Sequence, residues 1–236
     1  MTLDTGMENE LTRAEISAMR RSYGETGLDS LAEDPFAAFS TWLTEAHENP
    51  IIVEANAMVL STQDHKGLLS SRTVLLKDLS EDGFTFFTNY SSRKSKAMHS
   101  QPHVTLLFPW YAMERQVIIN GRAEQISRSE SEEYFATRPW NSQIGAWASR
   151  QSDPLESRSE LEDRWKAAAQ KWPEGSTVPT PPHWGGYRVF PDAIEFWQGR
   201  YSRLHDRLRY ERANVNENGV TAGTNEIKWE ITRLYP

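Results

Sequence analysis

The chain has 236 residues, of which 38% are hydrophobic and 25% charged, and its 33 acidic and 26 basic side chains give a net charge of −7. It is long enough for one sizeable domain or two small ones, too rich in aromatic residues for disorder, and without the roughly 20-residue apolar run that a bilayer helix needs. The absence of cysteine excludes disulfides and thiolate chemistry, and the acidic balance argues against general nucleic-acid binding, so any anionic ligand must be bound locally.

The first half of the chain predicts two helices and then a run of strands. The acidic start lacks the features of a secretory or transit signal, so we expect a cytoplasmic protein. Residues 8–28 predict a short helix that ends near Gly24, and residues 34–50 a clearer one, with Asp34 as its cap and Pro35 in its first turn. Strands are expected at residues 57–63, 69–79, 84–89, 103–110 and 114–126. Five strands joined by tight turns indicate an antiparallel meander or barrel.

The second half returns from helices to strands. Ser127 and Glu130 form a capping box for a helix that ends at Arg138-Pro139. Residues 156–172 predict a charged helix, and residues 173–182 a surface loop rather than a domain boundary. Strands are expected at residues 185–190, 193–199, 206–213 and 226–234, with the polar loop 214–225 between the last two. We therefore expect a single domain over residues 1–236, mainly β with flanking helices.

Several common types of site can be set aside. His99 and His103 are four residues apart, but Pro102 between them prevents a shared helical face, so we expect no metal site. No glycine-rich dinucleotide loop, Walker loop or serine nucleophile elbow is present. The acidic clusters fall on predicted helices and are typical of solvated faces.

Cationic residues on or beside the strands are the better candidates. Arg72 and Lys77 would point to opposite faces of their strand unless it bends, and Arg93 and Lys94 are expected in the loop after residue 89. Arginine forks and lysine point charges are what a phosphate ester requires. Solvated charges at strand ends are the alternative interpretation of these residues.

The stretch RLHDR, residues 203–207, adds further cationic groups. In an extended strand Arg203, His205 and Arg207 would project to one side, where they repel one another unless an anion or an electron-rich partner lies opposite. Salt bridges to carboxylates elsewhere in the fold are the alternative.

A series of linked motifs resembles the pyridoxamine 5′-phosphate oxidase family. The motifs, in chain order, are RTVLLK, FFTNYSSRKSKA, LLFPWYAMERQV, YFATRPWNSQIGAWASRQS, HWGGYRV, IEFWQG and RLHDR. The resemblance runs from about Arg20 to the C-terminal WEITRLYP, nearly the whole chain. It implies an FMN-binding split β-barrel that forms homodimers. It also implies oxidation of pyridoxine 5′-phosphate or pyridoxamine 5′-phosphate to pyridoxal 5′-phosphate, with hydride transfer to flavin N5 and reduction of dioxygen to hydrogen peroxide, as in vitamin B6 biosynthesis and salvage.

The resemblance further implies the site residues, with each FMN site shared between two subunits. FMN is expected at Arg72, Thr73, Val74, Leu75, Leu76, Lys77, Phe87, Thr88, Arg93, Lys94, Gln116, Gln151, Ser152, Trp197 and Arg207. The substrate phosphate is expected at Lys77, Tyr134, Arg138 and Ser142, and its ring at the catalytic residues Arg203 and His205. Arg20 and Tyr23, in an N-terminal segment of residues 1–25, are expected to close over the substrate as a mobile lid.

The expected roles follow from charge. Arg203 would orient the substrate over the flavin, and its fixed positive charge suits an anionic reduced flavin. His205 would form hydrogen bonds with the ring substituents, while the identity of any proton acceptor is left open.

Three other interpretations stay open. The chain could be a split-barrel flavoprotein with a different substrate or one that only carries flavin, or a single-strand nucleic-acid module that stacks bases on tryptophan. It could also be a dimeric scaffold without flavin, which the presence of Arg203 and His205 argues against. Net charge argues against the nucleic-acid module, and the salt dependence of binding would decide it.

Overall fold

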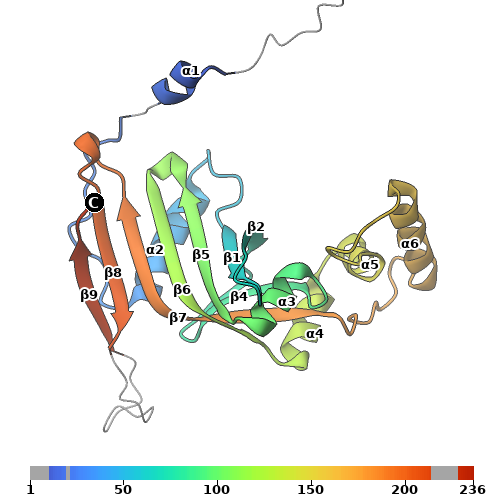
Figure 1. The fold of residues 1–236 in the computed structure, drawn as a ribbon. Coiled ribbons are helices and arrows are strands. Elements are labelled where there is room, and N and C mark those ends of the chain that lie inside the picture. The colour runs from blue at the N-terminus through green and yellow to red at the C-terminus, as the bar shows by residue number, and fades with distance from the viewer. Residues whose placement is uncertain (1–10, 20–21, 214–227) are drawn as a thin grey trace, which may run out of the picture.

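The computed structural model describes residues 11–19, 22–213 and 228–236. Its helices are α1 (Arg13–Ala18), α2 (Pro35–Glu48), α3 (Arg93–Ser100), α4 (Arg128–Thr137), α5 (Trp140–Ala148) and α6 (Arg158–Lys171), with the 3-10 turns η1 (Tyr111–Met113) and η2 (Tyr201–Arg203). Its strands are β1 (Ala57–Gln63), β2 (Leu69–Leu75), β3 (Asp78–Ser80), β4 (Gly83–Asn89), β5 (His103–Trp110), β6 (Arg115–Gln125), β7 (Trp184–Gln198), β8 (Asp206–Arg212) and β9 (Trp229–Leu234). All nine strands belong to one antiparallel sheet (Figure 1).

Strand β7 connects the two ends of this sheet. The strand order is β2-β1-β5-β6-β7-β4-β3, and β8 pairs with β7 and with β9. Along its length β7 pairs with β6, whereas on its other side it pairs first with β4 and then, from Ala193 onward, with β8. In Figure 1 this strand runs from the region of α4 to the β8–β9 edge. It therefore joins two regions that are otherwise far apart.

Two expectations about strands were wrong. The strands predicted at residues 185–190 and 193–199 are a single strand of 15 residues, β7. It continues through Pro191 because a register shift between Asn120 and Gly121 on β6 accommodates the residue that cannot donate a ladder hydrogen bond. The strand predicted at residues 69–79 ends at Leu75, and the chain bends there before β3.

The N-terminal helix is shorter than expected. Thr12 and Glu15 form a capping box at its start, but α1 ends at Ala18 and buries none of its residues, so no packing extends it. Residues 1–10 and 20–21, with part of the predicted lid, lie outside the described residues. The predicted loop at residues 214–225 also lies outside them.

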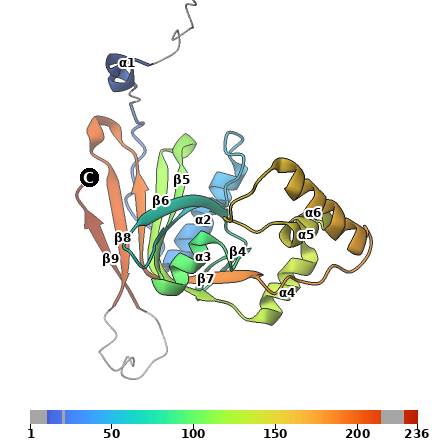
Figure 2. The ribbon, with the colours of Figure 1, turned by 45° about the vertical axis from the view of Figure 1, so that its right-hand side comes forward.

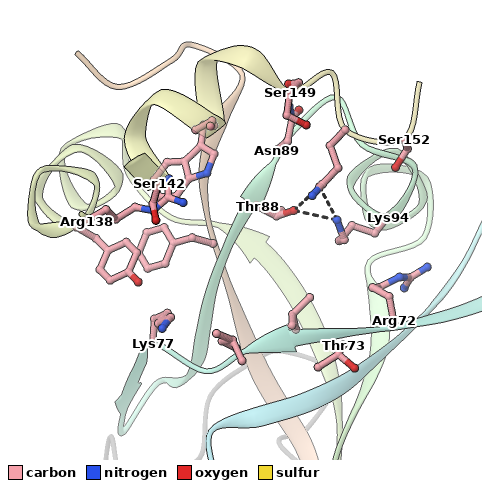
Figure 3. A pocket seen from close by; sticks show the side chains of 18 of the residues that line it. Arg72, Thr73, Lys77, Thr88, Asn89, Lys94, Arg138, Ser142, Ser149 and Ser152 are labelled. Atoms are coloured by element: carbon pink, nitrogen blue, oxygen red, sulfur yellow. Dashed lines mark hydrogen bonds between the residues drawn. The ribbon is translucent and has the colours of Figure 1, made fainter. Parts of the chain in front are cut away.

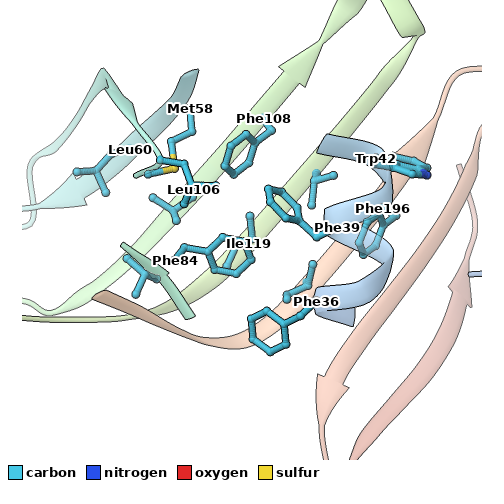
Figure 4. Close-up of a cluster of buried hydrophobic side chains, with 14 of the residues drawn as sticks. Phe36, Phe39, Trp42, Met58, Leu60, Phe84, Leu106, Phe108, Ile119 and Phe196 are labelled. Atoms are coloured by element: carbon cyan, nitrogen blue, oxygen red, sulfur yellow. The ribbon is translucent and has the colours of Figure 1, made fainter. Parts of the chain in front are cut away.

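Helix α2 packs on the sheet, and the side chains buried between them form the main hydrophobic core (Figure 4). The Asp34 carboxylate accepts hydrogen bonds from the amides of Phe36 and Ala37, which confirms the predicted cap. The Phe39 ring lies 5.0 Å from that of Phe84, edge to face, and Trp42 lies 5.1 Å from Phe196. Edge-to-face aromatic pairs of this kind add to the stabilisation that burial provides.

Helices α4, α5 and α6 form a second, smaller cluster (Figure 2). The capping box of Ser127 and Glu130 and the charged helix α6 are confirmed, whereas α5 was not predicted. The helices pack around Phe135, Ile144 and Trp184, next to the first residues of β7. None of the described helices combines the length and hydrophobicity that a bilayer crossing requires.

Candidate functional site

A large cavity of about 1030 Å³ lies between the β2–β4 region and helices α3 to α5 (Figure 3). Its charged lining residues are all cationic: Arg72, Lys77, Arg93, Lys94 and Arg138. No aspartate or glutamate is among the described residues that line it. We call this cavity the cationic pocket. Five positive side chains around one cavity without a carboxylate favour an anionic ligand.

The bend after β2 brings Arg72 and Lys77 into the same pocket. Leu76 is 5% exposed and faces the core, and its carbonyl accepts a hydrogen bond from the Asn56 side chain. The Lys77 amide donates to the Thr85 carbonyl at 2.8 Å, which ties the bent segment to β4. Arg72 and Lys77 are five residues apart and would point to opposite faces of a straight strand. Because the chain bends between them, both line the pocket.

Lys94 is the most buried of the five cations. It lies in the first turn of α3, where Ser92 is the cap, so the expectation that Arg93 and Lys94 lie in a loop was wrong. The Lys94 ammonium donates to Gln151 Oε1 at 2.7 Å and to Thr88 Oγ1 at 3.1 Å (Figure 3). Burial, and then the charge of Arg72, lower the pKa of Lys94 to about 8. No carboxylate among the described residues forms an ion pair with this ammonium, and a bound anion would compensate its charge.

Arg138 lies at the other side of the pocket, where α4 ends. Its guanidinium carbon is 4.8 Å from the centre of the Trp184 ring, a cation–π contact. Its Nη1 atom is buried without a hydrogen-bond partner among the described residues, and burial lowers the pKa of Arg138. Tyr134 stacks on Phe87 at 3.9 Å, beside it. A desolvated guanidinium with a donor that no described residue satisfies favours an anionic ligand.

A second group of predicted site residues lies at the far end of β7. Gln116 on β6, Trp197 on β7 and Arg207 on β8 are register partners and form one row across the sheet, which we call the strand row. Arg207 donates to the carboxylate of Glu195 at 2.8 Å, and this hydrogen bond raises the pKa of Arg207. Part of its donor capacity is thus already used.

The segment before β8 is not extended as expected. Arg203 belongs to η2 and has φ of 61°, next to Ser202 at φ of 54°, and β8 begins only at Asp206. The face proposed for Arg203, His205 and Arg207 together therefore does not exist. The His205 ring instead packs against Trp197, at 4.6 Å, and Tyr23, at 5.3 Å. We call residues 199–205 the arginine loop.

The predicted site residues thus fall into two groups. Those that line the cationic pocket are Arg72, Thr73, Val74, Leu75, Lys77, Phe87, Thr88, Arg93, Lys94, Tyr134, Arg138, Ser142, Gln151 and Ser152. Those outside it are Tyr23, Leu76, Gln116, Trp197, Arg203, His205 and Arg207. Arg20 lies outside the described residues. Apart from Leu76, the second group lies around the strand row and the arginine loop, near the last residues of β7, whereas its first residue, Trp184, lines the pocket.

The pocket also has lining residues that the sequence analysis missed. Among them are Asn89, Ser149 and Trp184. Asn89 donates to the Ser149 carbonyl at 3.4 Å, and Trp184 begins β7 against Phe87. All three belong to the quoted motifs: Asn89 to FFTNYSSRKSKA, Ser149 to YFATRPWNSQIGAWASRQS and Trp184 to HWGGYRV. The motifs themselves were therefore the available signal.

The antiparallel sheet and the cationic pocket define a β-sheet protein with a cavity suited to an anionic ligand. Residues 43–172 match the family profile described as pyridoxamine 5′-phosphate oxidase. Residues 184–236 match the pyridoxine 5′-phosphate oxidase C-terminal dimerisation region. The chain belongs to the pyridoxamine 5′-phosphate oxidase family.

Individual relatives agree with this assignment. The chain is 49% identical to the pyridoxine/pyridoxamine 5′-phosphate oxidase of Streptomyces avermitilis, over 93% of this chain and 96% of that protein. It is 52% identical to the protein of the same name from Rubrobacter xylanophilus, over 96% of this chain and 99% of that protein.

Two solved structures share the fold. PhzG from Burkholderia lata, solved with tetrahydrophenazine-1-carboxylic acid, has a TM-score of 0.77 and 28% identity, covering 89% of this chain and all of that one. A pyridoxamine 5′-phosphate oxidase-related, FMN-binding protein from Nostoc punctiforme has a TM-score of 0.65 and 15% identity, covering 87% of this chain and all of that one. The expected antiparallel split barrel is confirmed.

Proposed function

We propose that this chain is an FMN-dependent oxidase of phosphorylated B6 vitamers. It converts pyridoxine 5′-phosphate and dioxygen to pyridoxal 5′-phosphate and hydrogen peroxide; with pyridoxamine 5′-phosphate it also consumes water and releases ammonia. Family membership and the names of the relatives support this reaction. The observation that carries it is the cavity with five cations and no carboxylate, since a cofactor phosphate and a substrate phosphate together need that charge.

The described residues fit FMN. Lys94 is a buried cation whose pKa is lowered by desolvation and by Arg72, and a phosphate beside it would offset both effects. Arg93 lines the same pocket, and the backbone of residues 72–77 would hold the remainder of the cofactor. When bound, FMN supplies the hydride acceptor and passes the electrons to dioxygen. The protein supplies binding, orientation and charge.

The substrate phosphate would lie at the Arg138 side of the pocket. Arg138 Nη1 has no partner among the described residues, and Lys77, Tyr134 and Ser142 line the same cavity. A guanidinium can bind two phosphate oxygens at once, and a hydroxyl donates a third hydrogen bond. These four side chains would therefore distinguish phosphorylated from unphosphorylated vitamers.

We further propose a homodimer in which each site uses residues of both subunits. Arg203 and His205, expected at the substrate ring, do not line the pocket of their own chain, and neither does the strand row. The match of residues 184–236 to a dimerisation region supports a second copy that brings its arginine loop to the pocket. Arg203 would then hold a fixed positive charge against the substrate, because a guanidinium keeps its proton at neutral pH.

No nucleic acid and no membrane is expected among the partners. The net charge of −7 opposes a phosphate backbone, and five of the cations line one cavity. A cytoplasmic location stays a prediction.

The test is the visible absorbance of FMN-loaded protein during anaerobic addition of pyridoxine 5′-phosphate. We expect the oxidised flavin band to bleach and to return when air is admitted. A band that is present but does not bleach would mean that the chain binds flavin and acts on a different substrate.

A further inference from the structure

The imidazole of His205 is held by the backbone of the arginine loop. The amide of Arg200 donates a hydrogen bond to His205 Nδ1 at 3.1 Å. An amide N–H can only donate, so Nδ1 must carry a lone pair and not a proton. In a neutral imidazole the proton then resides on Nε2, which is left as a donor.

The loop that carries this amide is fixed at several points. The Gly199 amide donates to the Glu114 carbonyl at 2.7 Å, and the Tyr201 amide donates to the Gly24 carbonyl at 3.1 Å. The Arg200 guanidinium lies 3.4 Å from the Asp206 carboxylate, beyond the far end of the loop. These contacts hold the Arg200 amide in the orientation in which it faces the ring.

The charges around the ring oppose its protonation. Burial, and then the positive charge of Arg203, lower the pKa of His205. The carboxylate of the adjoining residue, Asp206, already accepts from the Leu28 amide and from the guanidinium groups of Arg200 and Arg233. On the other sides the ring meets the faces and edges of Tyr23 and Trp197 rather than a charge. The Glu114 carboxylate is engaged by the Gly24 amide.

We propose that His205 is a neutral hydrogen-bond donor through Nε2 and not the proton acceptor of the reaction, and that the Arg200 amide is the positioning group that fixes this tautomer. The proposal rests on the proposed function, since it assigns His205 a role toward the substrate ring. An Nε2 donor would bind an electron-rich oxygen substituent of that ring. The proton that the alcohol or amine group loses would go to solvent water.

The tautomer can be measured without turnover. In protein labelled with ¹⁵N-histidine, long-range correlation spectra separate a protonated ring nitrogen from one that carries a lone pair. The chain has 6 histidines, and the signals of His205 are those lost in His205→Gln. We expect an unprotonated Nδ1 and a protonated Nε2 for His205 near pH 7. A proton on Nδ1, alone or in the imidazolium, would overturn the proposal even if the oxidase activity is present.

Two substitutions test the role of Nε2 in catalysis. The amide of glutamine reaches the position of Nε2, whereas that of asparagine reaches the position of Nδ1. We expect His205→Gln to retain a kcat/KM about tenfold above that of His205→Asn, the value of one hydrogen bond. His103→Gln, at an exposed position on β5, is the control that should leave kcat/KM unchanged. If kcat/KM fell equally in the two His205 variants, and if the fall of kcat at acidic pH disappeared in both, His205 would be a general base instead.

Discussion

Lys94 illustrates how one buried cation prepares a site for an anion. Its ammonium donates hydrogen bonds to neutral oxygens of Gln151, Thr88 and Ser92. Its pKa falls from 10.5 to about 8 on folding, so between these values the unfolded chain binds more protons than the folded one. In the FMN-free protein this group therefore contributes a stability that rises with pH across that window.

The same shift predicts a pH-dependent affinity for FMN. A phosphate beside Lys94 favours the charged form and raises its pKa, so binding takes up a proton near and above pH 8. We expect the FMN affinity of the apoprotein to fall between about pH 7 and pH 9, measured by quenching of flavin fluorescence. Lys94→Met should weaken binding and flatten this dependence, whereas Lys96→Met, at an exposed position on the same helix, should not. An unchanged slope in Lys94→Met would contradict the assignment.

Arg138 is expected to set the preference for phosphorylated substrates. Arg138→Met keeps a side chain of similar length against Trp184 but removes the charge and the unpaired donor. We expect KM for pyridoxine 5′-phosphate to rise about ten- to a hundredfold, the range for hydrogen bonds to a charged group. Activity with unphosphorylated pyridoxine should change little. If Arg138→Met kept the unaltered protein's selectivity between the two vitamers, Arg138 would not bind the substrate phosphate.

At the scale of elements, Asp206 fastens the N-terminal segment to β8. Its carboxylate accepts from the Leu28 amide at 2.9 Å and from Arg233 on β9 at 2.7 Å. Arg233 in turn donates to the carbonyls of Leu28 and Asp29. The first residue of β8 thereby ties together the segment after Tyr23, the arginine loop and the last strand.

Asp206→Asn tests this anchoring. The asparagine keeps the shape of the side chain but gives up the charge, and one of its two acceptors becomes a donor that faces other donors. We expect the free energy of unfolding in urea to fall by about 1–3 kcal/mol, at a fixed protein concentration. Asp192→Asn, at an exposed position on β7, should have no effect. Equal stability of the two variants would mean that the segment is held by its other contacts.

At the scale of the whole molecule, the separation of the two groups of site residues is the main finding. The cationic pocket and the arginine loop lie at opposite ends of β7, and no residue of the loop lines the pocket. In a dimer with shared sites, the arginine loop of one copy would lie at the cationic pocket of the other. Dimers of two different variants can test this arrangement.

A heterodimer of two impaired chains should recover activity. When one chain carries Arg138→Met and the other Arg203→Ala, one of the two shared sites contains both altered residues and the other contains neither. Purified through two different tags, this heterodimer should have about half of the unaltered activity. Each homodimer has one altered residue in both of its sites, so each should be far less active. An inactive heterodimer would instead place each site within a single chain.

Some elements of the fold could be predicted from local sequence signals and others could not. Local signals were sufficient for the α2 cap, the Ser127 capping box, β5 and α6. They were not sufficient for β2 and β7. Nothing in RTVLLKDL marks the bend after Leu75, and a register shift at Pro191 and Ala193, which leaves Asp192 without a partner on β6, lets β7 continue through the proline. Arg203 was misplaced since alternation assumes an extended chain, whereas Ser202 and Arg203 take positive φ.

The site was predictable mainly through linked motifs. Pocket residues from four separate stretches, such as Lys94, Arg138 and Gln151, do come together. Charge alone could not show that the strand row and His205 lie elsewhere, because that depends on the length of β7. The assignments of these residues, the single domain and the lid over residues 1–25 stay predictions.

The length of β7 has a consequence for any assembly of two copies. At about 3.3 Å per residue, its 15 residues give a contour of roughly 45 Å between the pocket end and the arginine-loop end. In a dimer with shared sites, the length of this strand in each copy would then set the distance between the two catalytic centres. A one-residue insertion would exchange the two faces of the strand beyond it, unless a bulge absorbed the extra residue as the register shift at Asp192 does. The loops around the centres could then change in length and sequence while the length of β7 stays the same.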